Sequence, residues 1–193
     1  MTRTSSFILS LGCLLALTGC FAKVHTLPAH ADRHTPVFAP LPDRKTLLGL
    51  AVSGGGSRAA TFAAGTLEAL ASVRFTDAGS ERSVLEAITH MSSVSGGSLA
   101  TAYYAAKKPA RTEPVLAGDH LSPAYQQFFS RFKQDMQVNF QIRALGRQAL
   151  NFRIANPTKF AYSFADVWDA RFFDDMNFSD LYVRAQHGDA PQV

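Results

Sequence analysis

The chain has 193 residues, of which 47% are apolar and 11% aromatic, so it can bury one hydrophobic core and is not an intrinsically disordered chain. Its net charge of +4 is spread without a long basic run, which argues against a nucleic-acid-binding protein and is compatible with an anionic membrane surface as a partner. Its two cysteines, Cys13 and Cys20, both lie in the first segment. The body of the chain therefore has no thiol for a disulfide, a zinc cluster or a cysteine nucleophile.

The first twenty residues are typical of a secretion signal. Arg3 precedes the apolar stretch 7–17, which is too short to span a bilayer. Residues 17–20 read Leu-Thr-Gly-Cys, which resembles the lipobox of bacterial lipoproteins, in which the cysteine is lipidated and becomes the new N-terminus. We expect residues 1–19 to be a signal peptide and Cys20 to carry the lipid that holds the protein on a membrane. The alternative is a buried helix hairpin at the start of the chain.

The segment 20–44 is rich in proline and histidine and has no apolar period, so we interpret it as an extended tether. The irregular spacing of its histidines favours solvated linker residues over a metal site. Phe21 stands where an aspartate typically retains lipoproteins at the inner membrane. We therefore expect a lipid-anchored protein of the cell envelope, at the outer membrane and facing the periplasm.

A glycine loop follows. Residues 46–53 form a short apolar run that ends in Gly54, Gly55 and Gly56, and residues 57–72 are alanine-rich, which predicts a strand, a loop and a helix. Three successive glycines leave the backbone N–H groups open, and the N–H groups at the start of the helix add to them. Such a loop can bind a phosphate or the oxyanion of acyl transfer.

Two further interpretations of this loop remain open. Gly54, Gly56 and Ala59 match the dinucleotide fingerprint G-x-G-x-x-A, and Asp77 follows a possible strand downstream. The loop can also be a plain tight turn. A P-loop is excluded, because the required Gly-Lys-Ser or Gly-Lys-Thr is absent.

A second turn joins an approach strand, residues 84–90, to an alanine-rich helix, residues 99–107. Between them the chain reads Met-Ser-Ser-Val-Ser-Gly-Gly-Ser. A nucleophile elbow needs a serine at a strained strand-to-helix turn with very small neighbours. Ser95, followed by Gly96 and Gly97, meets this requirement, whereas the first glycine of the G-x-S-x-G motif is replaced by a serine.

Together the two loops resemble those of the patatin-like phospholipases. The matching segments are residues 53–60, 64–70 and 92–100, and the resemblance covers about residues 46–106. It implies a lipid or ester substrate, an acyl-enzyme, a Ser-Asp dyad without histidine, and no cofactor or metal. It also implies an α/β three-layer sandwich with a mainly parallel sheet, of which residues 45–193 form the N-terminal part.

The resemblance also assigns roles to individual residues. Ser95 attacks the ester, Gly54, Gly55 and Gly56 donate N–H groups to the oxyanion, and Arg58 holds the loop or an anionic head group. Both loops are expected at the carboxyl edge of the sheet, where open α/β sheets bind ligands. The alternatives from other classes are a dinucleotide-binding oxidoreductase and a non-catalytic envelope lipoprotein.

The general base is missing from this pattern. The family's aspartate lies in an Asp-Gly-Gly or Asp-Gly-Ala turn downstream of the serine, whereas residues 188–190 read Gly-Asp-Ala. Residues 191–193 look like the lead-in to another strand, so we expect a truncated chain with little esterase activity and the aspartate beyond Val193. An alternative base is His187. Its candidate orienting residues are Asp166, Asp169, Asp174 and Asp175.

In the remaining sequence, residues 107–123 are predicted to form a loop and residues 125–150 a helix with an aromatic face beside a basic one. This helix can cover the sheet, which we favour, or lie on a bilayer as a lid. The acidic residues of 166–175 have no recurring ligand spacing and are interpreted as solvated helix ends rather than a metal site. The sequence does not predict an oligomeric state.

Overall fold

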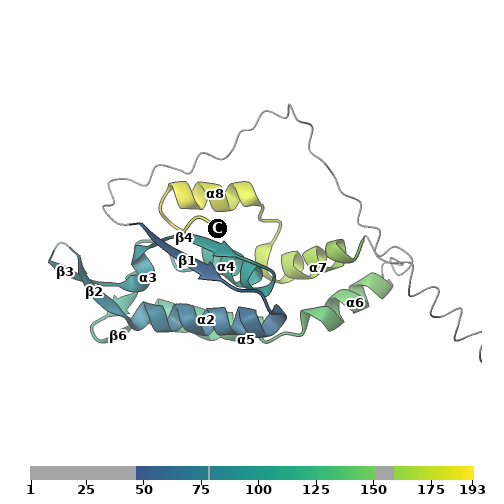
Figure 1. The fold of residues 1–193 in the computed structure, drawn as a ribbon, viewed down its shortest axis with the longest axis horizontal. Coiled ribbons are helices and arrows are strands. Elements are labelled where there is room, and N and C mark those ends of the chain that lie inside the picture. The colour runs from purple at the N-terminus through teal and green to yellow at the C-terminus, as the bar shows by residue number, and fades with distance from the viewer. Residues whose placement is uncertain (1–46, 78, 151–158) are drawn as a thin grey trace, which may run out of the picture.

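The computed structural model describes residues 47–77, 79–150 and 159–193 (Figure 1). The signal peptide, Cys20 and the tether were predicted for residues that lie outside these ranges. The elements in chain order are β1 (Leu48–Val52), α2 (Gly56–Ser72), β2 (Arg74–Asp77), β3 (Ser80–Ser83), α3 (Val84–Ala87), β4 (Ile88–Ser93), α4 (Gly96–Lys107), β5 (Leu116–Ala117), β6 (His120–Leu121), α5 (Pro123–Met136), α6 (Phe140–Leu150), α7 (Phe160–Trp168), η2 (Asp169–Phe173) and α8 (Phe178–Gln186).

Strands β1 and β4 form a parallel pair, while β2 with β3 and β5 with β6 form two antiparallel hairpins. Gln192 continues the parallel pairing on the other side of β4, where it forms a bridge with His90. Its carbonyl accepts from Met91 N at 2.7 Å, and its N–H donates to Thr89 O at 2.9 Å. The described part of the chain is thus a mixed helix and strand structure, with short sheets, that is consistent with a patatin-like α/β fold.

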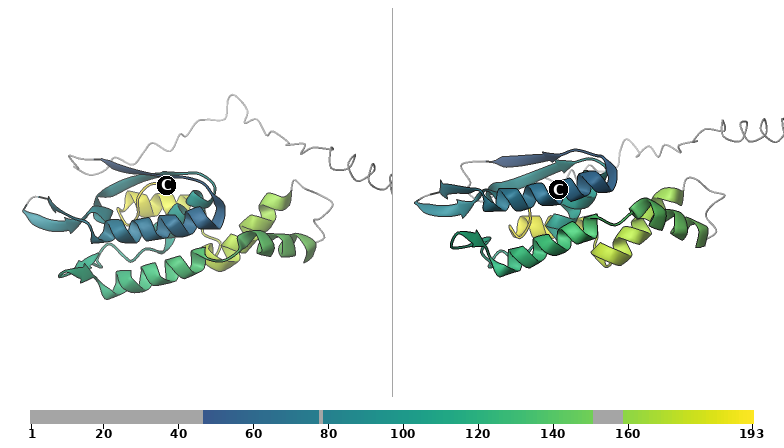
Figure 2. Two further views of the ribbon diagram at one scale, coloured as in Figure 1. Left: turned by 60° about the horizontal axis from the view of Figure 1, so that its bottom comes forward. Right: turned by 90° about the horizontal axis from the view of Figure 1, so that it is seen from below.

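Helices α2 and α4 cover one face of the parallel pair (Figures 1 and 2). The alternation along β1 turns the side chains of Leu48, Leu50 and Val52 toward this core, whereas Gly49 and Ala51 are exposed. The helices approach closely because small residues line their contacts. Those fully buried are Ala60, Ala64, Ala71 and Ala100.

The aromatic residues of α5 pack mainly against α2 and α4, one layer away from the sheet that they were expected to cover. Phe128, Phe129 and Phe132 are buried, and Tyr103 of α4 stacks on Phe132 with ring centroids 4.6 Å apart. The Tyr103 hydroxyl donates to Asp135 Oδ2 at 2.8 Å. Burial, together with this hydrogen bond, raises the pKa of Tyr103, so the hydroxyl remains a donor.

Local hydrogen bonds explain where the structure departs from the predicted elements. The expected helix 125–150 is two helices, because the Asn139 side chain accepts from Ile142 N and starts α6 as a separate helix. The first half of the expected strand 84–90 is the one-turn helix α3, which a capping box between Ser83 and Glu86 stabilises. The expected loop 107–123 contains the hairpin of β5 and β6.

Within the residues that the structure describes, no helix combines the length and the apolar character needed to cross a membrane.

Candidate active site

The glycine loop and the serine turn meet at one edge of the parallel pair. Because β1 and β4 run in the same direction, with Val52 opposite Ser93, both strands end at the same level. Val94 N donates to Val52 O at 3.3 Å across the two ends. A Cβ atom on Gly54 would lie 3.1 Å from Ser95 Cβ and 3.8 Å from Ser95 Oγ. The structure therefore brings together the two loops that the sequence predicted separately.

The glycines after the serine are required by backbone contact between the two turns. A Cβ on Gly96 would lie 2.1 Å from Gly56 O, and a Cβ on Gly97 would lie 2.6 Å from Ser53 O. Both obstructing atoms belong to the backbone, which cannot rotate away as a side chain does. Any larger residue at these positions forces the glycine loop and the serine turn apart.

Ser95 itself occupies a backbone conformation that L residues rarely adopt, with φ 55° and ψ −124°. It is the N-cap of α4, yet its side chain makes no capping hydrogen bond. Ser83 and Ser122 stand at the same position of α3 and α5, and both accept a backbone N–H there. The Ser95 hydroxyl thus lies on a strained turn and makes no capping hydrogen bond to α4, which is the geometry that a nucleophile elbow requires.

Ser93, which replaces the first glycine of the usual elbow motif, ties the end of β4 to α4. Ser93 Oγ and Thr101 Oγ1 lie 2.8 Å apart and share a hydrogen bond. Thr101 is 1% exposed and also donates to Ser98 O at 3.2 Å. A serine at position 93 is therefore accommodated by a specific partner on α4, which the sequence motif alone did not indicate.

The glycine loop opens α2 with two positive φ values, 142° at Gly55 and 65° at Gly56. Its helix has no side-chain N-cap, so the first N–H groups have no capping oxygen. These N–H groups carry the positive end of the helix dipole. Arg58, in the first turn, is exposed and forms no ion pair with any residue of the described ranges. The N-terminus of α2 and the Arg58 guanidinium therefore both contribute positive electrostatic potential beside Ser95.

A pocket of about 390 Å³ lies at this edge. Of the residues predicted for the two turns, Gly54 and Gly97 do not line it, and the others do. Leu99 and the aromatic rings of Phe140, Phe164 and Trp168 line it as well. The sequence does not place these aromatic residues at the site, because α6 and α7 are distant from both turns in the chain. The remaining lining residues, from the loop before α6 and its first turn, are Asn139 and Gln141.

The alternative catalytic residues are not brought to this pocket. Neither His187 nor any carboxylate is among its lining residues in the described part of the chain. Asp174 forms an ion pair with Lys107 at 3.3 Å, and Asp169 accepts from the backbone N–H of Asp175. Within the described ranges, no group of three or more His, Cys, Asp or Glu residues is placed to hold a metal ion.

The dinucleotide interpretation requires Asp77 to end a parallel strand beside β1. Instead, β2 pairs antiparallel with β3, and Asp77 forms an ion pair with Arg82 at 3.1 Å. The Asp77 carboxylate therefore lies in the β2–β3 hairpin, paired with Arg82, and not at the end of a parallel strand beside β1.

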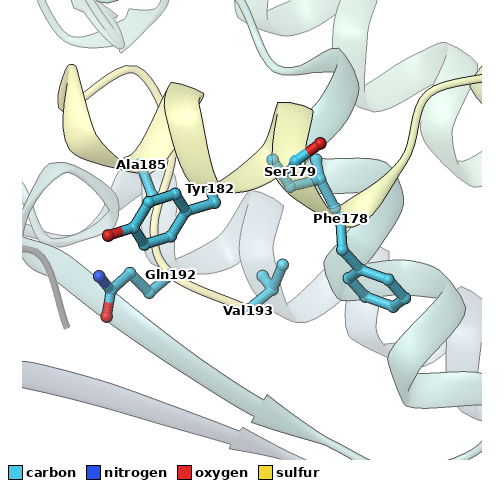
Figure 3. A pocket seen from close by; sticks show the side chains of 7 residues that line it. Phe178, Ser179, Tyr182, Ala185, Gln192 and Val193 are labelled. Atoms are coloured by element: carbon cyan, nitrogen blue, oxygen red, sulfur yellow. The ribbon is translucent and has the colours of Figure 1, made fainter. Parts of the chain in front are cut away.

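A second hollow, of about 480 Å³, lies between α8 and the last residues of the chain (Figure 3). Phe178 and Tyr182 line it from α8, and Gln192 and Val193 line it from the opposite side (Figure 3). None of the residues predicted for catalysis lines this hollow.

The two parallel strands, each ending in a tight turn before a helix, define an α/β protein with both candidate loops at one sheet edge. A family model of patatin-like phospholipases matches residues 50–188. The chain therefore belongs to the patatin-like phospholipase family, a family of lipid hydrolases, and the predicted resemblance is confirmed. No curated protein and no solved structure matches the chain significantly.

Proposed function

We propose that the protein is a serine acyl hydrolase that cleaves ester bonds of lipids and uses Ser95 as its nucleophile. The observation that carries this proposal is the strained turn at Ser95, whose hydroxyl caps no helix and lies beside Gly54. The family supports a lipid as the substrate. The aromatic wall formed by Phe140, Phe164 and Trp168 suits an acyl chain.

In the proposed reaction, Ser95 Oγ bonds to the ester carbonyl carbon while its proton passes to a general base. The tetrahedral intermediate then collapses, and the alcohol leaves with that proton. Water hydrolyses the acyl-enzyme in the same way and regenerates Ser95. The backbone N–H groups of Gly54, Gly55 and Gly56 stabilise the oxyanion in both steps, and the loss of one such donor typically costs a factor of about 10²–10³ in rate.

Two neighbours of the serine support this geometry. Gly96 and Gly97 let the serine turn touch the glycine loop, as their contacts with Gly56 O and Ser53 O indicate. Arg58 lines the pocket, its guanidinium forms no ion pair with the described residues, and it is proposed to bind an anionic head group or to hold the loop.

We propose that the general base is an aspartate beyond Val193, which completes a Ser-Asp dyad. The pattern of the family supports this position, and the described lining of the pocket consists of apolar, hydroxyl, amide and guanidinium groups. Residues 45–193 would then be the N-terminal part of a three-layer hydrolase domain with a mainly parallel sheet. The parallel bridge between Gln192 and His90 supports a further strand at that place.

The proposed envelope location rests on the sequence. Residues 1–19 are the signal peptide in this proposal, and residues 20–44 are the tether. Lipidation of Cys20 places the enzyme on the outer membrane, facing the periplasm and next to its substrate. Radiolabelled palmitate in growing bacteria tests this: label is expected on the protein and none on a Cys20→Ala variant.

Hydrolysis of a short-chain nitrophenyl ester tests the function. A chain extended past Val193 is expected to turn over the ester, and Ser95→Ala should abolish the turnover. Ser92→Ala is the matched control, because Ser92 is exposed on β4 and lines no part of this pocket. Unchanged turnover in Ser95→Ala contradicts the nucleophile. Strong, Ser95-dependent turnover by the 193-residue chain would place the base within it instead.

A further inference from the structure

Helix α6 has two apolar faces, of which the core covers one. Phe140 and Ala144 are buried, and Gln148 continues the same face one turn later. At 100° per residue, Ile142 falls about 160° from the centre of this buried face and Leu145 about 100° from it, so both point away from the core. Their exposures are 67% and 57%, and that of Leu150 at the helix end is 75%.

Helix α5 provides the contrast, because it has a similar apolar period but a polar outer face. A surface helix normally carries polar residues opposite its buried stripe. After Pro123 at its N-terminus, the exposed residues of α5 follow this rule and are Gln126, Gln127, Ser130, Arg131 and Gln134. The outer face of α6 breaks the rule at three bulky aliphatic side chains.

The charge on α6 indicates what its outer face meets. The helix contains Arg143 and Arg147 and no acidic residue. Both arginines are exposed, and neither forms an ion pair with a residue of the described ranges. Several other cations of the described ranges do form ion pairs, such as Lys133 with Glu68 at 2.7 Å and Arg171 with Asp135 at 3.0 Å. Exposed aliphatic side chains next to exposed arginines match an anionic bilayer. Its interface buries the aliphatic side chains, and its negative surface charge attracts the arginines.

The position of α6 connects this face to the candidate active site. Gln141, in its first turn, lines the pocket beside Ser95, and so does Asn139 just before it. Helices α6 and α7 extend from the body at the end toward which β1 and β4 run (Figures 1 and 2). A bilayer in contact with the outer face of α6 therefore lies next to the pocket.

We propose that the outer face of α6, formed by Ile142, Leu145 and Leu150 and flanked on one side by Arg143 and Arg147, docks on an anionic phospholipid bilayer. Its role in delivering lipid to Ser95 rests on the proposed function. The docking itself does not, because it requires only the exposed side chains of α6.

A local probe tests the proposal, because the body of the chain has no cysteine. In the full chain carrying Cys13→Ser and Cys20→Ser, an environment-sensitive NBD group is attached at Leu145→Cys on α6, or at Ser130→Cys on the polar face of α5 as the control. On phosphatidylglycerol vesicles, the group at position 145 should shift to shorter wavelength and be quenched by spin-labelled lipid. The group at position 130 should do neither. Equal signals at both positions, or equal quenching on phosphatidylcholine vesicles, overturn the proposal.

Two variants separate the contributions. Arg143→Gln combined with Arg147→Gln should weaken partition to the anionic vesicles about 25-fold, roughly fivefold per arginine. Arg131→Gln on α5 should leave it unchanged. A blue shift that appears without vesicles and grows with protein concentration means that a second copy covers α6, which overturns the proposal. Ser95→Ala should dock normally, so a failure of the nucleophile and a failure of docking are distinguishable.

Discussion

The two strand-to-helix turns have the same position in the fold but differ in which residue takes the unusual conformation. Each follows a strand of the parallel pair and opens a helix. In the first turn the positive φ values fall on Gly55 and Gly56, which adopt them without steric cost. In the second turn the positive φ falls on Ser95, where it costs roughly 1–3 kcal/mol. The first turn thus exposes backbone N–H groups at the site, whereas the second exposes the Ser95 hydroxyl from a strained backbone conformation.

The contact between the turns is tested most severely by Gly96→Ala. Its Cβ would lie 2.1 Å from Gly56 O, so the two turns must separate. We expect a loss of about 3 kcal/mol in the free energy of unfolding, measured by urea denaturation, and a loss of turnover.

Gly65→Ala, on α2, is the matched control for Gly96→Ala, because a Cβ at position 65 would have no contact within 4 Å. It should be neutral or stabilise by up to about 1 kcal/mol. Equal stability of the two variants would mean that the turns do not touch as described.

Ser95→Gly tests the strain itself. Glycine accepts the φ of 55° without penalty, so this variant should gain about 1 kcal/mol in the free energy of unfolding while losing all turnover. Ser95→Ala should lose turnover without this gain, because alanine keeps the strain. A Ser95→Gly protein no more stable than Ser95→Ala argues against a strained turn.

Thr101→Val removes the partner of Ser93 with little change in side-chain volume. We expect a loss of about 1 kcal/mol in the free energy of unfolding and a lower kcat, since the end of β4 is less firmly held. Ser93→Gly in the same background should recover part of the stability by removing the unpaired hydroxyl. If the double variant is as unstable as the single one, the hydrogen bond is not the cause.

Arg58→Gln should have the smallest effect on stability, within about 0.5 kcal/mol, because the side chain is exposed and has no ion-pair partner in the part of the chain that the structure describes. In the proposed role it raises KM for an anionic phospholipid more than for a neutral ester. Equal KM changes for both substrates would assign Arg58 to the loop rather than to the head group.

Both turns could be predicted from the sequence because each is encoded locally, as an apolar run, small residues and an alanine-rich helix. Their proximity could be inferred only through the parallel pairing of their strands. The aromatic wall could not be predicted, because Phe140 and Trp168 follow Ser95 by many residues and look like ordinary core residues in the sequence. The same holds for α5 and α6, since a helical period does not indicate whether an apolar face is covered by α2 and α4 or left exposed.

The central claim is that Ser95 is a nucleophile, and its covalent modification is the most direct measurement. A chain that includes the proposed downstream aspartate is incubated with a fluorophosphonate, digested and analysed by mass spectrometry. We predict one adduct per chain, on the peptide that contains Ser95, and none in Ser95→Ala. An adduct on another serine, or none on folded protein, would contradict the assignment.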